Sequence, residues 1–70
     1  MPAVLHFWDM RTLLTSAHET VDDAVAEAYA FAVSDTAIPV RITTPSGTML
    51  MDEKTLSEAI LRHGERKPTR

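Results

Sequence analysis

The sequence predicts an α+β fold of order β-β-α-β-β-α, in which two helices cover one face of a small antiparallel four-stranded sheet. Three observations predict it. Residues 20–34 repeat apolar side chains with the period of a helix, the other apolar segments are short and rich in Val, Ile, Thr and aromatic residues, and turn-forming residues separate these segments. A mixed sheet, with parallel pairing of the first and third strands, is the alternative.

The N-terminal segment predicts a hairpin. Residues 3–8 form one strand, residues 9–12 a tight turn that begins with Asp, and residues 12–17 a second strand. Both faces of the first strand are apolar, so its register stays open. One long bent strand or an irregular segment is the alternative, because the turn contains neither Gly nor Pro.

Residues 20–34 predict the first helix. The Thr20 hydroxyl can accept a hydrogen bond from a free backbone N–H, and Asp23 stands where a capping box places its acidic residue. Asp22 and Asp23 also suit the positive end of the helix dipole. The predicted buried face is made mostly of small residues: Val21, Ala24, Val25, Ala28 and Ala32.

The second half of the chain predicts another hairpin. Pro39 disfavours helix at Ile38, and residues 40–44 alternate as a strand does. Residues 45–47, Pro-Ser-Gly, suit a short turn, after which residues 48–51 pair back as the fourth strand.

A second helix is predicted over residues 53–63. Asp52 is its cap, Thr55 with Glu58 offers a competing capping box, and Gly64 is the expected stop. Its apolar face contains Leu56, Ala59, Ile60 and His63. We expect a single domain over residues 1–63 and a basic, disordered tail over residues 64–70, which has no apolar side chain to bury.

Composition limits the class of protein. A 70-residue domain buries only about 60% of its unfolded surface, and with no cysteine for a disulfide it gains most from oligomerisation. We expect a cytoplasmic protein, since neither a secretory signal nor a membrane-spanning run is evident. Residues 1–61 carry three basic and nine acidic groups, a net charge of −6, whereas residues 62–70 carry four basic groups and one acidic group.

Residues 13–51 resemble a family of short bacterial domains of unknown function. The matching features are a strand that ends in Ser-x-His, a helix that starts at Thr and is rich in alanine and acidic residues, a strand, a Gly turn and a last strand. They lie at residues 15–18, 20–32, 40–43, 45–47 and 48–51. The resemblance implies a β-β-α-β-β core and no particular chemistry, and the second helix and basic tail depart from it.

No residue set predicts catalysis, a cofactor or a metal. His18 is interpreted as a surface or loop-bracing residue, His6 as a partly buried hydrogen-bonded residue and His63 as a helix-end residue, because three or four converging ligands are missing. Ser16 and His18 share a strand face but lack a nucleophile elbow or a Gly-rich loop. We therefore expect neither an enzyme nor a small-molecule substrate.

Two kinds of binding remain. The first is protein binding, either to a second copy or to a larger host, by large apolar residues that one helix face does not bury: Trp8, Phe31 and Leu61. Packing of these residues between the two helices is the structural alternative. The second is nucleic-acid binding through Arg62, Arg66, Lys67 and Arg70. We prefer protein binding, because the acidic body opposes contact with phosphate.

Overall fold

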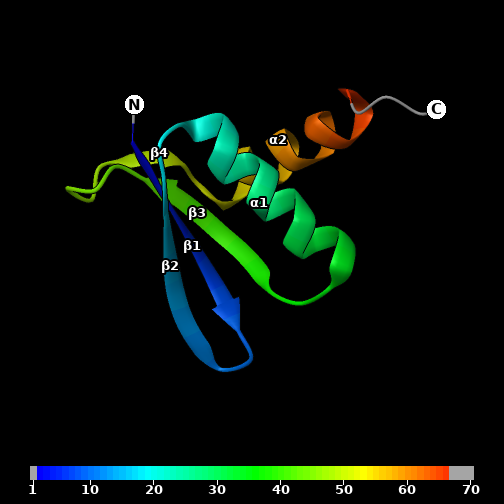
Figure 1. Ribbon diagram of the computed structural model, residues 1–70, viewed down its shortest axis with the longest axis horizontal. Helices are drawn as coiled ribbons and strands as arrows, with labels where there is room; N and C mark the ends of the chain where they lie inside the picture. The colour runs from blue at the N-terminus through cyan, green and yellow to red at the C-terminus, as the bar shows by residue number, and fades with distance from the viewer. Residues whose placement is uncertain (1, 67–70) are drawn as a thin grey trace.

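The computed structural model describes residues 2–66 and shows four strands and two helices in the predicted order (Figure 1). The elements are β1 Ala3–Asp9, β2 Thr12–His18, α1 Val21–Ser34, β3 Ile38–Thr43, β4 Met49–Met51 and α2 Glu53–Arg66. The α+β class predicted from the sequence is confirmed.

The strands form one sheet of order β2-β1-β3-β4, and every neighbouring pair is antiparallel. The alternative of parallel pairing between the first and third strands is wrong. β2 returns beside β1, and α1 then crosses back over the sheet, so that β3 starts at the hairpin end of β1, where Ile38 pairs with Trp8. The crossing helix therefore reverses the direction of β3 relative to β1.

The first hairpin has a two-residue turn, which fixes the register that the sequence left open. Asp9 pairs with Thr12, and the ladder continues to Ala3 and His18. Alternate residues of β1 point to opposite faces, and Ala3 and Leu5 are fully buried beneath the helices. Phe7 shares their face, with its ring centroid 4.7 Å from that of Phe31 on α1.

α1 begins as predicted, since the Thr20 hydroxyl accepts a hydrogen bond from the Asp23 backbone N–H at 3.1 Å. The buried face is shorter than expected. Ala24, Val25 and Ala28 are buried, but Ala32 is exposed. In the last turn the larger Phe31 packs against the core instead.

The second hairpin turns where residues 45–47 predicted it. Gly47 has a φ of 101°, a conformation that only glycine adopts at low cost. β3 starts earlier than predicted, at Ile38, and β4 is short, at Met49–Met51. Asp52 then caps α2 by accepting a hydrogen bond from the Thr55 backbone N–H at 2.8 Å.

The prediction that α2 stops at Gly64 is wrong, because the helix continues to Arg66. Gly64 has no positive φ, and it lies where α2 passes the ring of Tyr29. A Cβ at this position would stand 2.9 Å from Cε1 of that ring. Gly64 thus permits close helix packing, and residues 64–66 belong to α2. Residues 67–70 of the predicted tail lie outside the described residues.

The core lies between the sheet and the helix layer. Its largest fully buried side chains are Leu5 of β1, Ile42 of β3 and Leu56 of α2. Each comes from a different element, so the core joins β1, β3 and α2, while the small residues of α1 allow that helix to lie close to the sheet.

Candidate protein-interaction surface

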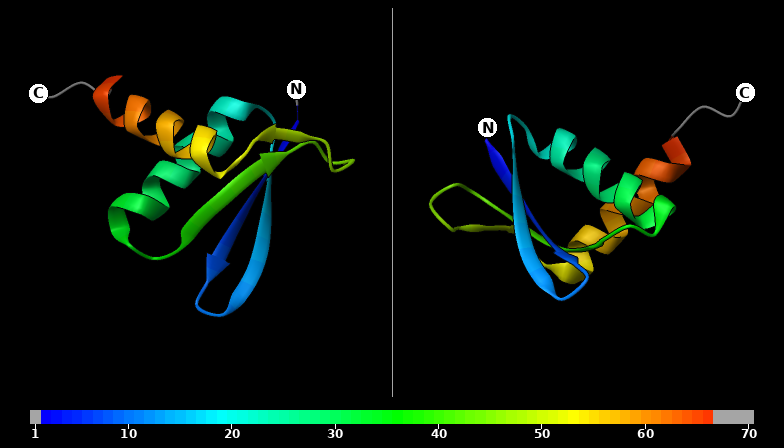
Figure 2. Two further views of the ribbon diagram at one scale, coloured as in Figure 1. Left: turned by 180° about the vertical axis from the view of Figure 1, so that it is seen from behind. Right: turned by 60° about the horizontal axis from the view of Figure 1, so that its bottom comes forward.

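Both helices lie on one face of the sheet, and no helix or strand within residues 2–66 covers the other face (Figure 2). Because Phe7 points to α1, its neighbours Trp8 and His6 point to this open face. Cross-strand partners share a face, which assigns the rest from the register. The open face consists of Val4, His6, Trp8, Leu13, Thr15, Ala17, Ile38, Arg41, Thr43 and Met49.

Three large apolar side chains lie in a line across the hairpin end of this face. Trp8 pairs with Leu13 on one side and with Ile38 on the other, and we call these three residues the apolar row. All are exposed, Trp8 with 41% of its surface. Together they present an apolar surface on the order of a few hundred Å², the size at which such a patch becomes a candidate contact site.

Met10 extends the apolar row at the tip of the hairpin. It is 94% exposed and has a φ of 59°. The left-handed region is unfavourable for a residue with a Cβ, and glycine, Asn or Asp usually occupies it in hairpin turns. An exposed apolar side chain therefore stands at a position where both local conformation and solvation favour another residue.

The charge of the open face differs from that of the rest of the body. Its titratable members are Arg41 and His6, and none of the described residues assigned to it is acidic. His6 Nε2 lies 2.9 Å from the hydroxyl oxygen of Thr43. Burial, and secondarily the Arg41 guanidinium, lower the pKa of His6 below its ordinary value. The face is thus apolar at the hairpin end and weakly basic at its centre.

His18 lies on the other face of the sheet, where it connects β2 to α1. Its Nε2 atom contacts the Glu27 carboxylate and also lies 3.2 Å from the Ser16 hydroxyl oxygen. A catalytic triad needs the hydroxyl and the carboxylate on different ring nitrogens, but here both meet the same atom. This geometry supports the bracing role predicted for His18 and gives Ser16 no general base.

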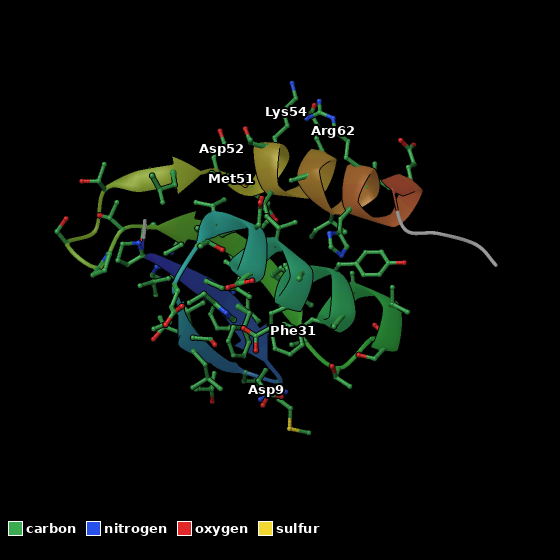
Figure 3. The ribbon with its side chains drawn as sticks, turned by 45° about the horizontal axis from the view of Figure 1, so that its top comes forward. Asp9, Phe31, Met51, Asp52, Lys54 and Arg62 are labelled. Atoms are coloured by element: carbon green, nitrogen blue, oxygen red, sulfur yellow. The ribbon has the colours of Figure 1, made fainter. Side chains whose placement is uncertain are left out.

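A groove of about 270 Å³ lies between α1, α2 and β4. It is lined by Asp22, Val25, Met51, Ala59, Arg62 and His63, and Met51 and Arg62 are labelled in Figure 3. The His63 ring lies against Tyr29, with centroids 5.0 Å apart. Within residues 2–66 no three His, Cys, Asp or Glu side chains are close enough to hold a metal ion.

The structure separates the residues predicted to contact a partner. Trp8 is exposed on the open face, whereas Phe31 is partly buried against Phe7 on the helix side. Leu61 is 68% exposed on α2. Because α2 packs on the opposite face from Trp8, the three residues do not form one surface. The structural alternative, packing between the two helices, is not seen for these residues, because Trp8 and Leu61 are exposed and the ring of Phe31 packs on Phe7 of β1. A surface centred on Trp8 therefore does not include Leu61.

The predicted nucleic-acid residues are only partly described. Arg62 lines the groove that Asp22 also lines. The side chain of Arg66, and Lys67 and Arg70 as a whole, lie outside what the structure describes.

Leu13, Ile38 and Met10 were not identified from the sequence as contact residues. The signal that finds Leu13 and Met10 is the length of the first turn. A two-residue turn makes Asp9 pair with Thr12, and therefore Trp8 with Leu13. Ile38 needed the β1–β3 register, which a bulge shifts between His6 and Phe7.

Comparison of the chain with protein-family models, with curated proteins and with solved structures finds no match. The resemblance over residues 13–51 therefore stays a prediction. In the described part of the chain, neither helix is long and apolar enough to span a membrane. The class that fold and surface define is a small α+β domain with one sheet face that neither helix covers and that is apolar at its hairpin end.

Proposed function

We propose that this chain is a non-catalytic protein-interaction module, a small accessory or regulatory factor that binds itself or a larger host protein. The observation that carries the proposal is the apolar row, Leu13, Trp8 and Ile38, aligned across three strands on a face that neither helix covers. Tryptophan is among the residues most enriched at the centre of protein interfaces, and the flanking Leu13 and Ile38 extend the apolar surface around it.

Two further observations support the same surface. Met10, beside the apolar row, keeps an exposed apolar side chain in a strained conformation, and strain of this kind is often retained at sites of contact. The open face also lacks acidic groups among its described residues, while residues 1–61 have a net charge of −6. A partner with an apolar and weakly acidic surface complements it.

We retain the cytoplasm as the expected location, because a chain without cysteine fits a reducing compartment. We also retain a non-catalytic role. Its support is the geometry of Ser16 and His18, the best candidates for a nucleophile and a base. The Ser16 hydroxyl and the Glu27 carboxylate both contact the same ring nitrogen of His18, Nε2.

The test compares capture by three baits from a lysate of the source cell. They are the wild-type chain, the double variant Trp8→Thr with Ile38→Thr, and the control Leu61→Gln. Threonine suits a strand, and Leu61 is as exposed as Ile38 but lies on α2. Circular dichroism and a thermal melt first establish that all three are folded.

We expect a partner that wild type and Leu61→Gln capture and that the double variant loses. Equal capture by all three baits would contradict the proposed surface. The competing nucleic-acid function predicts instead that capture falls steeply with salt and disappears on nuclease treatment or on deletion of residues 65–70. That outcome would replace the proposal.

A further inference from the structure

The two edges of the sheet differ in length and in protection. β4 is an edge of three residues followed by Asp52, whereas β2 is an edge of seven residues. Residues 12–17 of β2 include no charged residue and no proline. Natural sheets usually protect a long edge with such residues, because its free backbone groups can pair with another strand.

The register of the hairpin shows which backbone groups are free. The two-residue turn closes on the Asp9–Thr12 pair, and in an antiparallel ladder alternate residues exchange hydrogen bonds with the neighbouring strand. The N–H and C=O groups of Leu13, Thr15 and Ala17 therefore point away from β1. They form a regular row of donors and acceptors along the outer side of β2.

We propose that a second copy of this chain pairs with this edge, β2 against β2 in antiparallel orientation, about a two-fold axis at Thr15. The two sheets then become one continuous sheet. This inference rests on the proposed function, since it names the partner in self-association and the strand that binds it.

The side chains of β2 suit pairing with themselves. In a register centred on Thr15, Leu13 lies opposite Ala17 of the second copy on the open face, and Leu14 lies opposite Ser16 of the second copy on the helix face. Each large residue thus meets a small one. Leu13 and Leu14 are both exposed in the single chain, so the pairing shields apolar surface on both faces.

Charge also favours a second copy at this edge. Residues 1–61 carry a net charge of −6, which opposes most approaches of two identical chains. β2 is neutral from residue 12 to residue 17, and His18 at its end already contacts Glu27 of its own chain. Pairing there brings no like charges directly opposite each other.

The helices leave room for this arrangement. α1 packs on β1, β2 and β3, so it is centred over β1. With strands about 4.8 Å apart, the two-fold axis would separate the two α1 helices by about 14 Å. This exceeds the 8–10 Å at which packed helices lie, so the helices do not block the pairing.

The size of the contact sets its strength. One pair of seven-residue strands buries less than the roughly 1,200 Å² of a stable interface. We therefore expect a reversible dimer that forms with a dissociation constant in the micromolar range or weaker. Its proportion increases with protein concentration.

The first experiment measures mass by light scattering from about 10 μM to about 1 mM. We expect the wild-type mass to rise from 7.8 kDa toward twice that value. Thr15→Pro removes an outward N–H without removing a hydrogen bond to β1, so this variant should stay folded. Its self-association should be at least 10-fold weaker than that of wild type, which leaves it largely monomeric. The matched control Thr15→Val keeps the N–H and should dimerise as wild type does.

The second experiment uses the absence of cysteine in the chain. Residues paired by hydrogen bonds across an antiparallel ladder have Cα atoms about 5.5 Å apart, within the range of a disulfide. Thr15→Cys should therefore form a covalent dimer under mild oxidation much faster than Ser46→Cys, a control in the exposed turn before β4. If Thr15→Pro does not fold, this experiment alone tests whether β2 pairs with β2 of a second copy.

Three results would overturn the second-copy proposal. They are a wild-type mass that stays monomeric at every concentration, dimerisation of a folded Thr15→Pro variant at wild-type strength, and crosslinking of Thr15→Cys no faster than Ser46→Cys. A monomer whose capture of a host still depends on Trp8 and Ile38 would leave the proposed function intact. Capture independent of the apolar row would refute that function separately.

Discussion

Replacing Met10 with glycine should stabilise the protein while weakening the binding of a partner at the apolar row. Met10 has a φ of 59°, and a residue with a Cβ in that region costs about 1 kcal/mol relative to glycine. Part of this gain is offset, because glycine increases the entropy of the unfolded chain. We expect the unfolding free energy to rise by about 0.5–1 kcal/mol. For a domain of this size the melting temperature then rises by about 2–8 °C.

The matched control is Arg11→Gly at the next residue of the turn. Arg11 does not have a positive φ, so glycine there only adds unfolded-state entropy and should lower the melting temperature. Thermal unfolding followed by circular dichroism measures both variants. A lower melting temperature for Met10→Gly, or equal effects of the two changes, would refute the strain argument. If Met10→Gly captures the partner as well as wild type does, Met10 has no contact role.

The remaining predictions concern the core, the helix crossing and pH. Leu56→Ala should cost about 3 kcal/mol, because Leu56 is 1% exposed, while Leu61→Ala on the same helix should cost less than about 0.5 kcal/mol. Gly64→Ala should destabilise by about 1 kcal/mol, because its Cβ would stand 2.9 Å from the Tyr29 ring. The lowered pKa of His6 means that the unfolded chain binds more protons near pH 6.5. Stability therefore falls as the pH decreases from about 7 through the folded pKa, and His6→Gln should reduce that loss.

Each of these predictions has a contradicting result. Equal unfolding midpoints for Leu56→Ala and Leu61→Ala in urea would mean that α2 does not contribute to the core. A more stable Gly64→Ala would show that helix propensity outweighs the contact with Tyr29. If the unfolding free energies of wild type and His6→Gln fall in parallel between pH 7.5 and pH 5, protonation of His6 is not the cause of the loss of stability.

The sequence predicted the order of elements and most of their ends, because these depend on local chemistry. Thr20 and Asp52 cap their helices through hydrogen bonds to residues three positions later, and Gly47 takes the positive φ of its turn. Gly64 shows the limit of local signals. A glycine near a helix end is usually a stop, but here the ring of Tyr29, 35 residues away in sequence, determines its role.

The candidate surface was predicted less well for a related reason. Trp8 stands out in the sequence as a large apolar residue that one helix face does not bury. Its partners depend on the registers of two ladders and on a bulge between His6 and Phe7. Phe31 lies on the other face of the sheet from Trp8, which helical periodicity alone does not indicate. Its ring in fact packs on Phe7.

The distribution of unfavourable local choices argues for function at one end of the molecule. The N-terminal caps of both helices and the second hairpin turn follow the usual sequence preferences. Asp35 at the end of α1 also has a positive φ, but Asp tolerates this conformation better than Met does. The first hairpin departs from them twice, with an exposed methionine at positive φ and an unprotected edge strand that bears two exposed leucines. These departures adjoin the apolar row. A chain of 70 residues has little stability to lose, so several unfavourable choices clustered at one site are better explained by contact with a partner than by the requirements of the fold.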